Sequence, residues 1–190
     1  ILPMFGKGIQ LFKAEVPEIT VEKLRPRLVD TAKSLWYIYT TLTVLAAIFY
    51  ILGGMSIYDG ICHAFTTLAT GGFSTKNTSI AYFNSTYIDI VCIIFMFLAG
   101  INYTLYFFAF KGDFKKFFKS EEFRFYIIVT TIAVLLITFN IWKKDYKSVF
   151  DAFRYALFQV VSIMTTTGYA TADYEKWSFF AQMAIITLML

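Results

Sequence analysis

Three long stretches of this chain contain no charged residue, and this pattern limits the possible folds more than any other feature. They cover residues 35–52, 90–110 and 125–142 and are 18, 21 and 18 residues long. Eighteen residues of α-helix rise about 27 Å, close to the bilayer hydrocarbon thickness of about 30 Å. Apolar residues make up 58% of the chain, above the roughly 45–50% of soluble proteins. The sequence therefore predicts an all-α membrane protein.

A fourth uncharged stretch, residues 177–190, reaches the last residue of the chain, which also begins without methionine. We therefore expect a piece of a longer protein that ends inside a membrane-spanning helix. Eleven of the 17 Lys and Arg residues lie within residues 1–33 and 111–124. The positive-inside rule places both segments in the cytoplasm, although the Lys143–Lys147 cluster falls on the opposite side.

Two shorter apolar segments, charged only at Asp151 and Arg154, lie between the long stretches, and each leads into a loop that contains glycine. The loops read Thr70-Gly71-Gly72-Phe73-Ser74 and Thr166-Thr167-Gly168-Tyr169-Ala170. The preceding segments predict short helices over residues 60–69, capped by Asp59, and 151–164, begun by a capping box at Ser148–Asp151. Asp59 lies 13 residues before Gly72, whereas Asp151 lies 17 before Gly168. We therefore expect one extra turn in the second short helix.

The order span, short helix, loop, span thus occurs twice, and such self-similarity in a membrane protein indicates internal repeats. We divide the chain into a cytoplasmic or interfacial segment (1–33), a pore repeat (34–110), a cytoplasmic loop (111–124) and a further pore repeat (125–190), truncated in its inner helix. Each short helix is expected to be re-entrant, because it is too short to cross the membrane.

A polar loop at membrane depth is tolerated only where protein buries it or where it lines a wet cavity. Backbone carbonyls can replace the water of a permeating cation, and glycine allows successive carbonyls to be aimed alike. The C-terminal end of the preceding helix adds a partial negative charge. We therefore predict an ion-binding filter made of Ala69, Thr70, Gly71, Gly72, Phe73, Thr165, Thr166, Thr167, Gly168 and Tyr169. The carbonyls expected to bind potassium belong to Thr70, Gly71, Gly72, Thr166, Thr167 and Gly168.

Both loops resemble the potassium-channel filter Thr-Val-Gly-Tyr-Gly. Its threonine, first glycine and tyrosine align with Thr70, Gly72 and Phe73, and in the second loop with Thr166, Gly168 and Tyr169. The second filter glycine is replaced by Ser74 and Ala170. This departure predicts weaker discrimination between potassium and sodium.

The chain as a whole resembles the TrkH-type membrane subunits of bacterial Trk potassium uptake systems, within the Trk/Ktr/HKT superfamily. The stretches that carry the resemblance are Gln10–Glu15, Leu35–Tyr39, His63–Thr67 continuing into Thr70–Thr75, Gly100–Tyr103 and Thr165–Tyr169.

The resemblance implies four repeats around one pore, of which this piece holds the second and third, with the first and fourth missing. It also implies potassium uptake across the cytoplasmic (inner) membrane by a multi-pass protein surrounded by membrane lipid. Further implications are a homodimer, a cytosolic nucleotide-binding regulatory subunit and a gating loop beyond the last residue of this chain. No cofactor and no nucleic acid partner are expected.

Three alternatives were weighed against potassium uptake. The main alternative is a less selective sodium or ammonium channel or transporter, because each loop keeps only one of the two glycines of the potassium-channel filter. A membrane enzyme is not expected, since no catalytic constellation is present, and a structural subunit would leave the costly loops unexplained. Cys62 and His63 are adjacent and lack further partners, so no metal site is expected there.

Three polar residues near the spans have open roles. Asn102 either lines an inner cavity or packs against a neighbouring helix by hydrogen bonding. Asp89 is interpreted as a solvated helix start, and Asp173 as a surface residue, although both could concentrate cations near the loops.

Overall fold

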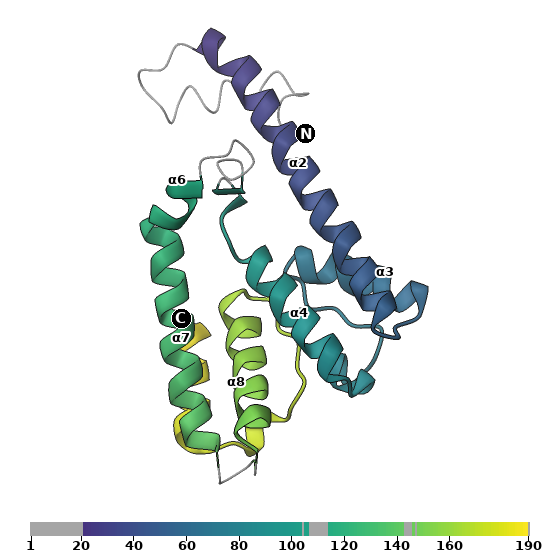
Figure 1. Cartoon of the computed structure of the whole chain (residues 1–190), viewed down its shortest axis with the longest axis vertical. Coiled ribbons are helices and arrows are strands. Elements are labelled where there is room, and N and C mark those ends of the chain that lie inside the picture. Colours follow the sequence, from purple (N-terminus) through teal and green to yellow (C-terminus); the bar gives the residue numbers. More distant parts are fainter. Residues whose placement is uncertain (1–20, 104, 107–113, 143–145, 147, 190) are drawn as a thin grey trace.

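The computed structural model describes residues 21–103, 105–106, 114–142, 146 and 148–189, and within these residues the fold is helical, without a β-strand. This confirms the all-α prediction for the described residues. The α-helices are α2 (Val21–Leu52), α3 (Ile57–Leu68), α4 (Thr86–Ala99), α6 (Phe114–Lys119), α7 (Glu121–Ile141), α8 (Val149–Met164) and α9 (Phe179–Met189) (Figure 1). Two 3₁₀-helices, η2 (Ser79–Phe83) and η3 (Tyr174–Lys176), follow the two loops.

Among the residues that the structure describes, two helices are long and apolar enough to cross a membrane. They comprise Ala32–Leu52 within α2 and Glu121–Ile141, which is the whole of α7, and each is 21 residues long. The outer face of α7 exposes large apolar side chains such as Leu135 and Phe139. Exposing such an apolar surface to water costs free energy, whereas exposing it to lipid does not. Most of the expected 1–33 segment lies outside the described residues, and α2 already begins at Val21.

The second uncharged stretch is not one continuous helix, so that expectation is wrong. Helix α4 has 14 residues and ends at Ala99, with Gly100 as its C-cap. A methyl group added at Gly100 would lie 2.7 Å from the Thr165 side chain and 2.8 Å from the Tyr126 hydroxyl. The carbonyl of Leu98 accepts a 2.6 Å hydrogen bond from the hydroxyl of Tyr106 in addition to the N–H of Ile101 at 3.2 Å. Tight packing against the second loop therefore accompanies the break.

The short helices begin earlier than the sequence predicted. Ser56, not Asp59, is the N-cap of α3: its hydroxyl oxygen accepts the Asp59 N–H at 3.1 Å and its hydroxyl donates to the Asp59 carboxylate at 2.9 Å. Ser148 precedes α8 but makes no side-chain capping bond, so the predicted capping box there is wrong. The lengths of α3 and α8, 12 and 16 residues, confirm the extra turn.

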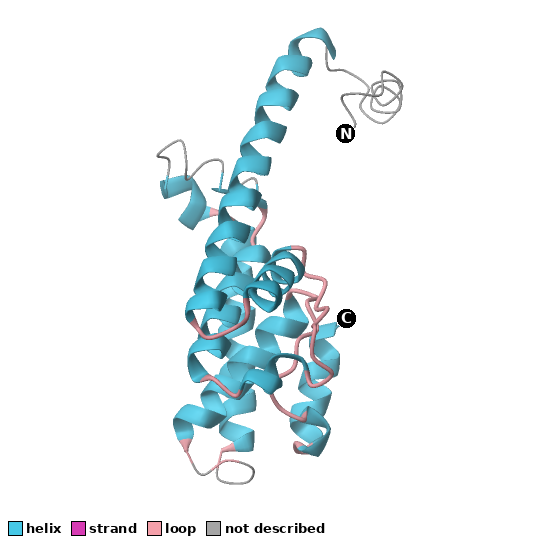
Figure 2. Cartoon of the chain, turned by 90° about the vertical axis from the view of Figure 1, so that its right-hand side faces the viewer, coloured by secondary structure: helices cyan, strands magenta, loops and turns pink. Residues whose placement is uncertain are grey.

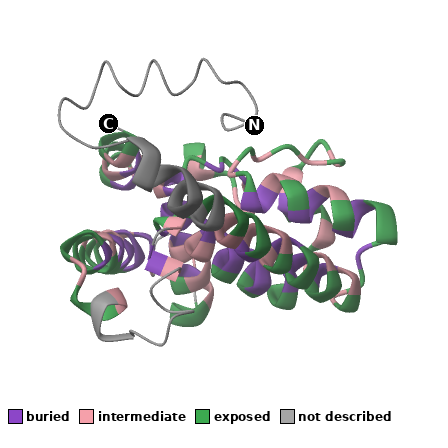
Figure 3. Cartoon of the chain, turned by 90° about the horizontal axis from the view of Figure 1, so that it is seen from above, coloured by how far each residue is buried: buried purple, intermediate pink, exposed green. Residues whose placement is uncertain are grey.

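The helices form two packed units that meet along α4 and α8. The first core joins α2, α3 and α4 around Tyr50 and Met96, and the second joins α7, α8 and α9 around Ile137 and Ile185. Phe158 of α8 belongs to the first core and connects the units. Figure 2 shows the start of α2 extending beyond the other helices, and Figure 3 shows the buried faces of the helices turned inward. This arrangement brings the two loops together between the units.

Candidate functional site

The first loop leaves α3 through a complete Schellman motif. The N–H of Thr70 donates to the carbonyl of Thr67 at 3.1 Å, and the N–H of Gly71 donates to the carbonyl of Thr66 at 2.8 Å. These bonds satisfy helix-end carbonyls that otherwise have no partner. The motif fixes the direction in which the chain leaves the helix.

The second loop leaves α8 in the same way. The N–H of Thr166 donates to the carbonyl of Ile163, and the N–H of Thr167 donates to the carbonyl of Ser162, both at 2.9 Å. Helices α3 and α8 therefore end alike, although their sequences differ at the residues that accept these bonds.

A side-chain hydroxyl stabilises each loop at the same place. Thr66 donates to the carbonyl of Phe73 at 2.9 Å, and Ser162 donates to the carbonyl of Tyr169 at 2.7 Å. Each hydroxyl lies seven residues before the carbonyl that it holds. The carbonyls of the two aromatic residues thus have protein donors.

The backbone dihedrals of the loops also match. The φ angles of Thr70 and Thr166 are +50° and +57°, and those of Gly72 and Gly168 are +63° and +80°. Glycine adopts positive φ freely, but a β-branched threonine there is an outlier that costs about 1–3 kcal/mol. Such strain persists only where the surrounding structure holds it, which is common at ligand sites.

The six carbonyls that the sequence assigned to a cation have no protein donor. Within the part of the chain that the structure describes, none of them accepts a hydrogen bond. Thr167 is buried, yet its carbonyl is among them. Because three of the six residues are exposed and Thr167 alone among them is buried, the missing hydrogen bonds leave these six carbonyls available to water or to a further ligand. They belong to Thr70, Gly71, Gly72, Thr166, Thr167 and Gly168.

The two loops touch each other through their backbones. A methyl group added at Gly72 would lie 1.8 Å from the carbonyl oxygen of Thr167 and 3.4 Å from the carbonyl carbon of Gly168. Behind this contact, the N–H of Ala81 donates to the carbonyl of Ala170 at 3.2 Å, and the Ala170 N–H donates to the hydroxyl of Ser79 at 3.3 Å. Residues 96 positions apart in the sequence therefore form one site.

The aromatic residues of the loops lie in different surroundings. Tyr169 is fully buried, and its hydroxyl lies 2.5 Å from that of Thr66 and 3.4 Å from the carbonyls of His63 and Phe73. The Phe73 side chain is 77% exposed. Tyr169 thus supports the first loop from behind.

A polar network at the start of α3 supports the same loop. The carboxylate of Asp59 accepts hydrogen bonds from Thr75 at 2.5 Å and Ser56 at 2.9 Å, and it pairs with Lys76 at 3.4 Å. The Thr75 bond contributes most to lowering the pKa of Asp59, followed by the Ser56 bond. His63 donates from Nδ1 to the carbonyl of Asp59 at 2.7 Å and accepts from Ser74 at Nε2, at 2.9 Å. The network fixes residues 74–76 to α3.

Asp89 is buried, so its interpretation as a solvated helix start is wrong. Its carboxylate pairs with the guanidinium of Arg154, whose side chain is itself nearly buried. Arg154 also contacts Asp151 at 3.3 Å and lies over the Tyr155 ring at 4.3 Å. This ion pair joins α4 to α8 and so holds the two units together. Asn102 donates to Glu122 at 3.3 Å, consistent with a packing role.

The sequence model of the TrkH family, described as a cation transport protein, matches residues 1–190. The chain belongs to the TrkH family. Among solved structures, the crystal structure of the potassium transporter TrkH from Vibrio parahaemolyticus superposes with a TM-score of 0.81 at 38% identity. That match covers 92% of this chain and 37% of the other. The helical fold is therefore that of TrkH proteins.

The curated relatives include TrkH of Vibrio parahaemolyticus, which is 40% identical over 98% of this chain and 40% of its own length. TrkH of Escherichia coli is 40% identical over 98% of this chain and 39% of its own length. TrkG of Escherichia coli is 33% identical over 93% and 37%. All three are named potassium uptake proteins of a Trk system, not enzymes. The chain spans about two fifths of the length of these TrkH-family relatives.

Several residues at the candidate site were not predicted from the sequence. The hydroxyls of Thr66 and Ser162 were missed, although their equal spacing to the loop aromatics could have revealed them. No comparable sequence pattern indicates that Tyr169 is buried or that both ring nitrogens of His63 form hydrogen bonds, because each feature depends on contacts between distant segments.

Proposed function

We propose that this chain forms half of a potassium-conducting pore, in which the two loops are adjacent sides of a selectivity filter. The observation that carries the proposal is the pair of loops with the same strained backbone, meeting at Gly72 and presenting six carbonyls without protein donors. Six carbonyl oxygens can replace water molecules that a cation loses from its hydration shell. In this account α3 and α8 are re-entrant pore helices.

The short helices add an electrostatic contribution. Both end at the loops, so their C-terminal partial charges of about −0.5 face the place where a cation would bind. The hydroxyls of Thr66 and Ser162 hold the loops from behind without occupying the six carbonyls. The chain thus supplies two sides of the filter, and the first and fourth repeats of the full-length protein supply the others in a pseudo-fourfold pore.

Potassium would move inward with the membrane potential, which contributes about 2.3 kcal/mol per charge for each 100 mV. The names of the relatives support potassium as the cation and uptake as the direction. As the family resemblance implies, we further propose a multi-pass homodimer in the cytoplasmic membrane with a cytosolic nucleotide-binding regulator. The relatives are named as proteins of a Trk system, which supports an assembly of several components.

The test uses the full-length protein reconstituted in liposomes, with potassium and sodium fluxes measured side by side. Gly72→Ser adds a side chain at φ +63° against the Thr167 carbonyl, whereas a methyl group at Gly71 meets the Phe73 ring at 3.4 Å, an ordinary contact. Gly72→Ser should therefore lower the potassium-to-sodium flux ratio much more than Gly71→Ala. An unchanged ratio in Gly72→Ser would contradict the filter assignment.

A less selective cation pathway is the second candidate. It is favoured by Ser74, which stands where the second filter glycine would be and is bound to His63 instead of facing a cation. Sodium flux equal to potassium flux in the unmodified protein would select this candidate.

A further inference from the structure

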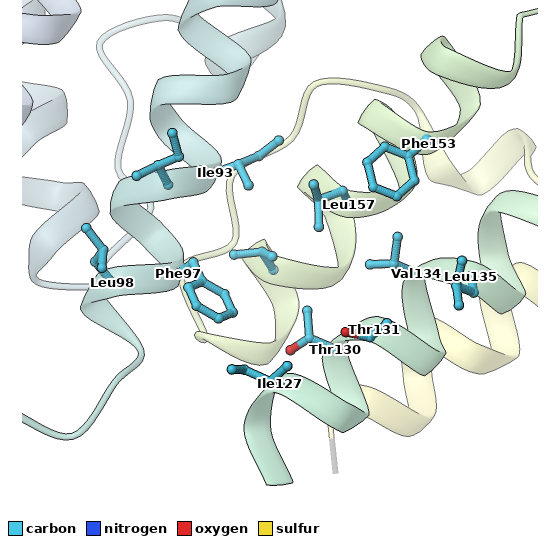
Figure 4. Close-up of a pocket in the computed structure, with 12 residues that line it drawn as sticks. Ile93, Phe97, Leu98, Ile127, Thr130, Thr131, Val134, Leu135, Phe153 and Leu157 are labelled. Carbon is cyan, nitrogen blue, oxygen red and sulfur yellow. The ribbon is translucent and has the colours of Figure 1, made fainter. Parts of the chain in front are cut away.

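An apolar groove lies where the two units meet, and neither the loops nor the six free carbonyls line it. Helices α4, α7 and α8 form its walls, and the cavity measures about 430 Å³. Figure 4 shows Phe97 of α4, Val134 of α7 and Leu157 of α8 gathered around it. The hydroxyl of Thr130, one of the two polar lining residues, already donates to the carbonyl of Tyr126 at 2.7 Å. The groove therefore suits an apolar ligand.

The groove is long enough to take part of a single hydrocarbon chain. Along α7 the lining runs from Ile127 to Leu135, a rise of about 12 Å. At the rim of the groove, Ile94 of α4 and Leu135 of α7 are 50% and 58% exposed, so the groove is open to the molecular surface. Because α7 is long and apolar enough to span a membrane, we expect this opening to face lipid.

A basic residue stands at the end of the groove where α7 begins. Arg124 lies three residues before Ile127 and seven before Thr131, so all three share one face of the helix. Arg124 is exposed and, among the described residues, it forms no ion pair. A guanidinium binds phosphate oxygens through paired hydrogen bonds. The positive charge thus complements an anionic headgroup whose chain enters the groove.

We propose that this groove binds one acyl chain of an anionic phospholipid and that Arg124 holds the phosphate. The acyl chain of the lipid would pack against Leu157 and Val161 of α8 and against Ile93 of α4. It would thereby fill the junction between the two units and stabilise α8 in its place. The proposal rests on the groove and on membrane insertion, not on the filter.

The headgroup is tested on the full-length protein in detergent, supplied with phosphatidylglycerol or phosphatidylcholine and examined by native mass spectrometry. We expect one phosphatidylglycerol to be retained more strongly than phosphatidylcholine. Arg124→Gln should weaken phosphatidylglycerol retention about fivefold, which corresponds to about 1 kcal/mol for one charge near the membrane surface. Lys119→Gln removes the same charge from α6 and should leave the preference intact. Equal retention of the two lipids by the unmodified protein would overturn the assignment of Arg124.

The groove is tested by filling it. Thr131→Trp places an indole in the groove from an exposed position, while Ile132→Trp adds the same group to α7 outside the lining. Thr131→Trp should abolish lipid retention and the rise in melting temperature that phosphatidylglycerol produces. Ile132→Trp should preserve both. Undiminished retention in Thr131→Trp, or no retained lipid in the unmodified protein because another segment covers the groove, would overturn the proposal.

Discussion

The loop at residues 69–73 and the loop at residues 165–169 share one backbone conformation but are held in different ways. Both leave a short helix through a Schellman motif and carry positive φ at a threonine and a glycine. The first is supported by Tyr169 from the other unit and by the Asp59 network of its own helix. The second is followed by Ala170, whose backbone bonds to Ser79 and Ala81 of the first unit.

This difference shows which features the loop geometry requires and which are supplied locally. The helix-end hydrogen bonds, the strained threonine and the hydroxyl that holds the aromatic carbonyl occur in both loops. The acids, bases and aromatic rings around them are arranged differently in each unit. We therefore expect the shared features to determine how the loops bind a cation, and the other features to determine the stability of the fold.

The largest expected effect on stability comes from the ion pair that joins the units. Asp89→Ala leaves the Arg154 guanidinium nearly buried without its partner on α4. Removing one member of a buried pair costs about 3–5 kcal/mol. Thermal unfolding of the full-length protein should show this loss. Lys176→Ala, which breaks the exposed pair with Asp173, should cause no measurable change; equal effects of the two would contradict the role of Asp89.

Gly72 and Gly168 should respond unequally to the same substitution. Both have positive φ, so alanine at either costs about 1–3 kcal/mol of backbone strain. At Gly72 the added methyl group also overlaps the Thr167 carbonyl, whereas at Gly168 it meets nothing within 4 Å. Flux assays should therefore show a greater loss of potassium selectivity for Gly72→Ala. Equal losses would mean that contact between the loops does not matter.

The hydroxyl of Tyr169 should contribute less. Tyr169→Phe keeps the ring but removes the group that lies near Thr66 and the carbonyl of Phe73. A lost buried hydrogen bond of this kind costs about 1–2 kcal/mol. We expect a lower melting temperature and a reduced potassium-to-sodium ratio. Tyr82→Phe, at an exposed ring, is the control and should change neither.

The smallest effect concerns pH. The folded-state pKa of Asp59 is lowered, so its contribution to stability is present above the unfolded pKa of about 3.9 and is lost as pH falls through the folded value. Asp59→Asn should therefore lower stability at neutral pH and flatten the decline on acidification. Parallel acid-unfolding curves for the two proteins would contradict this contribution.

Much of the helical fold follows from the sequence because charge-free stretches of 18 residues leave few alternatives to helices in lipid. The break after Ala99 could not be predicted, since it accompanies contacts of Gly100 with Thr165 and Tyr126. The pairing of Asp89 with Arg154 connects residues 65 positions apart, and nothing local signals it.

The candidate site was predictable in its position and less so in its construction. Paired Thr-x-Gly-aromatic motifs located both loops, and glycine at positive φ was expected. That Thr70 and Thr166 would adopt the left-handed conformation was not, because propensity argues against it and tertiary contacts override propensity.

Anomalous diffraction from the full-length protein, with rubidium or thallium in place of potassium, tests the cation site most directly. The account predicts anomalous peaks between the two loops, coordinated by the free carbonyls of residues 70–72 and 166–168. Peaks at any other place in a transport-competent protein, with these carbonyls turned away from the ion, would contradict it.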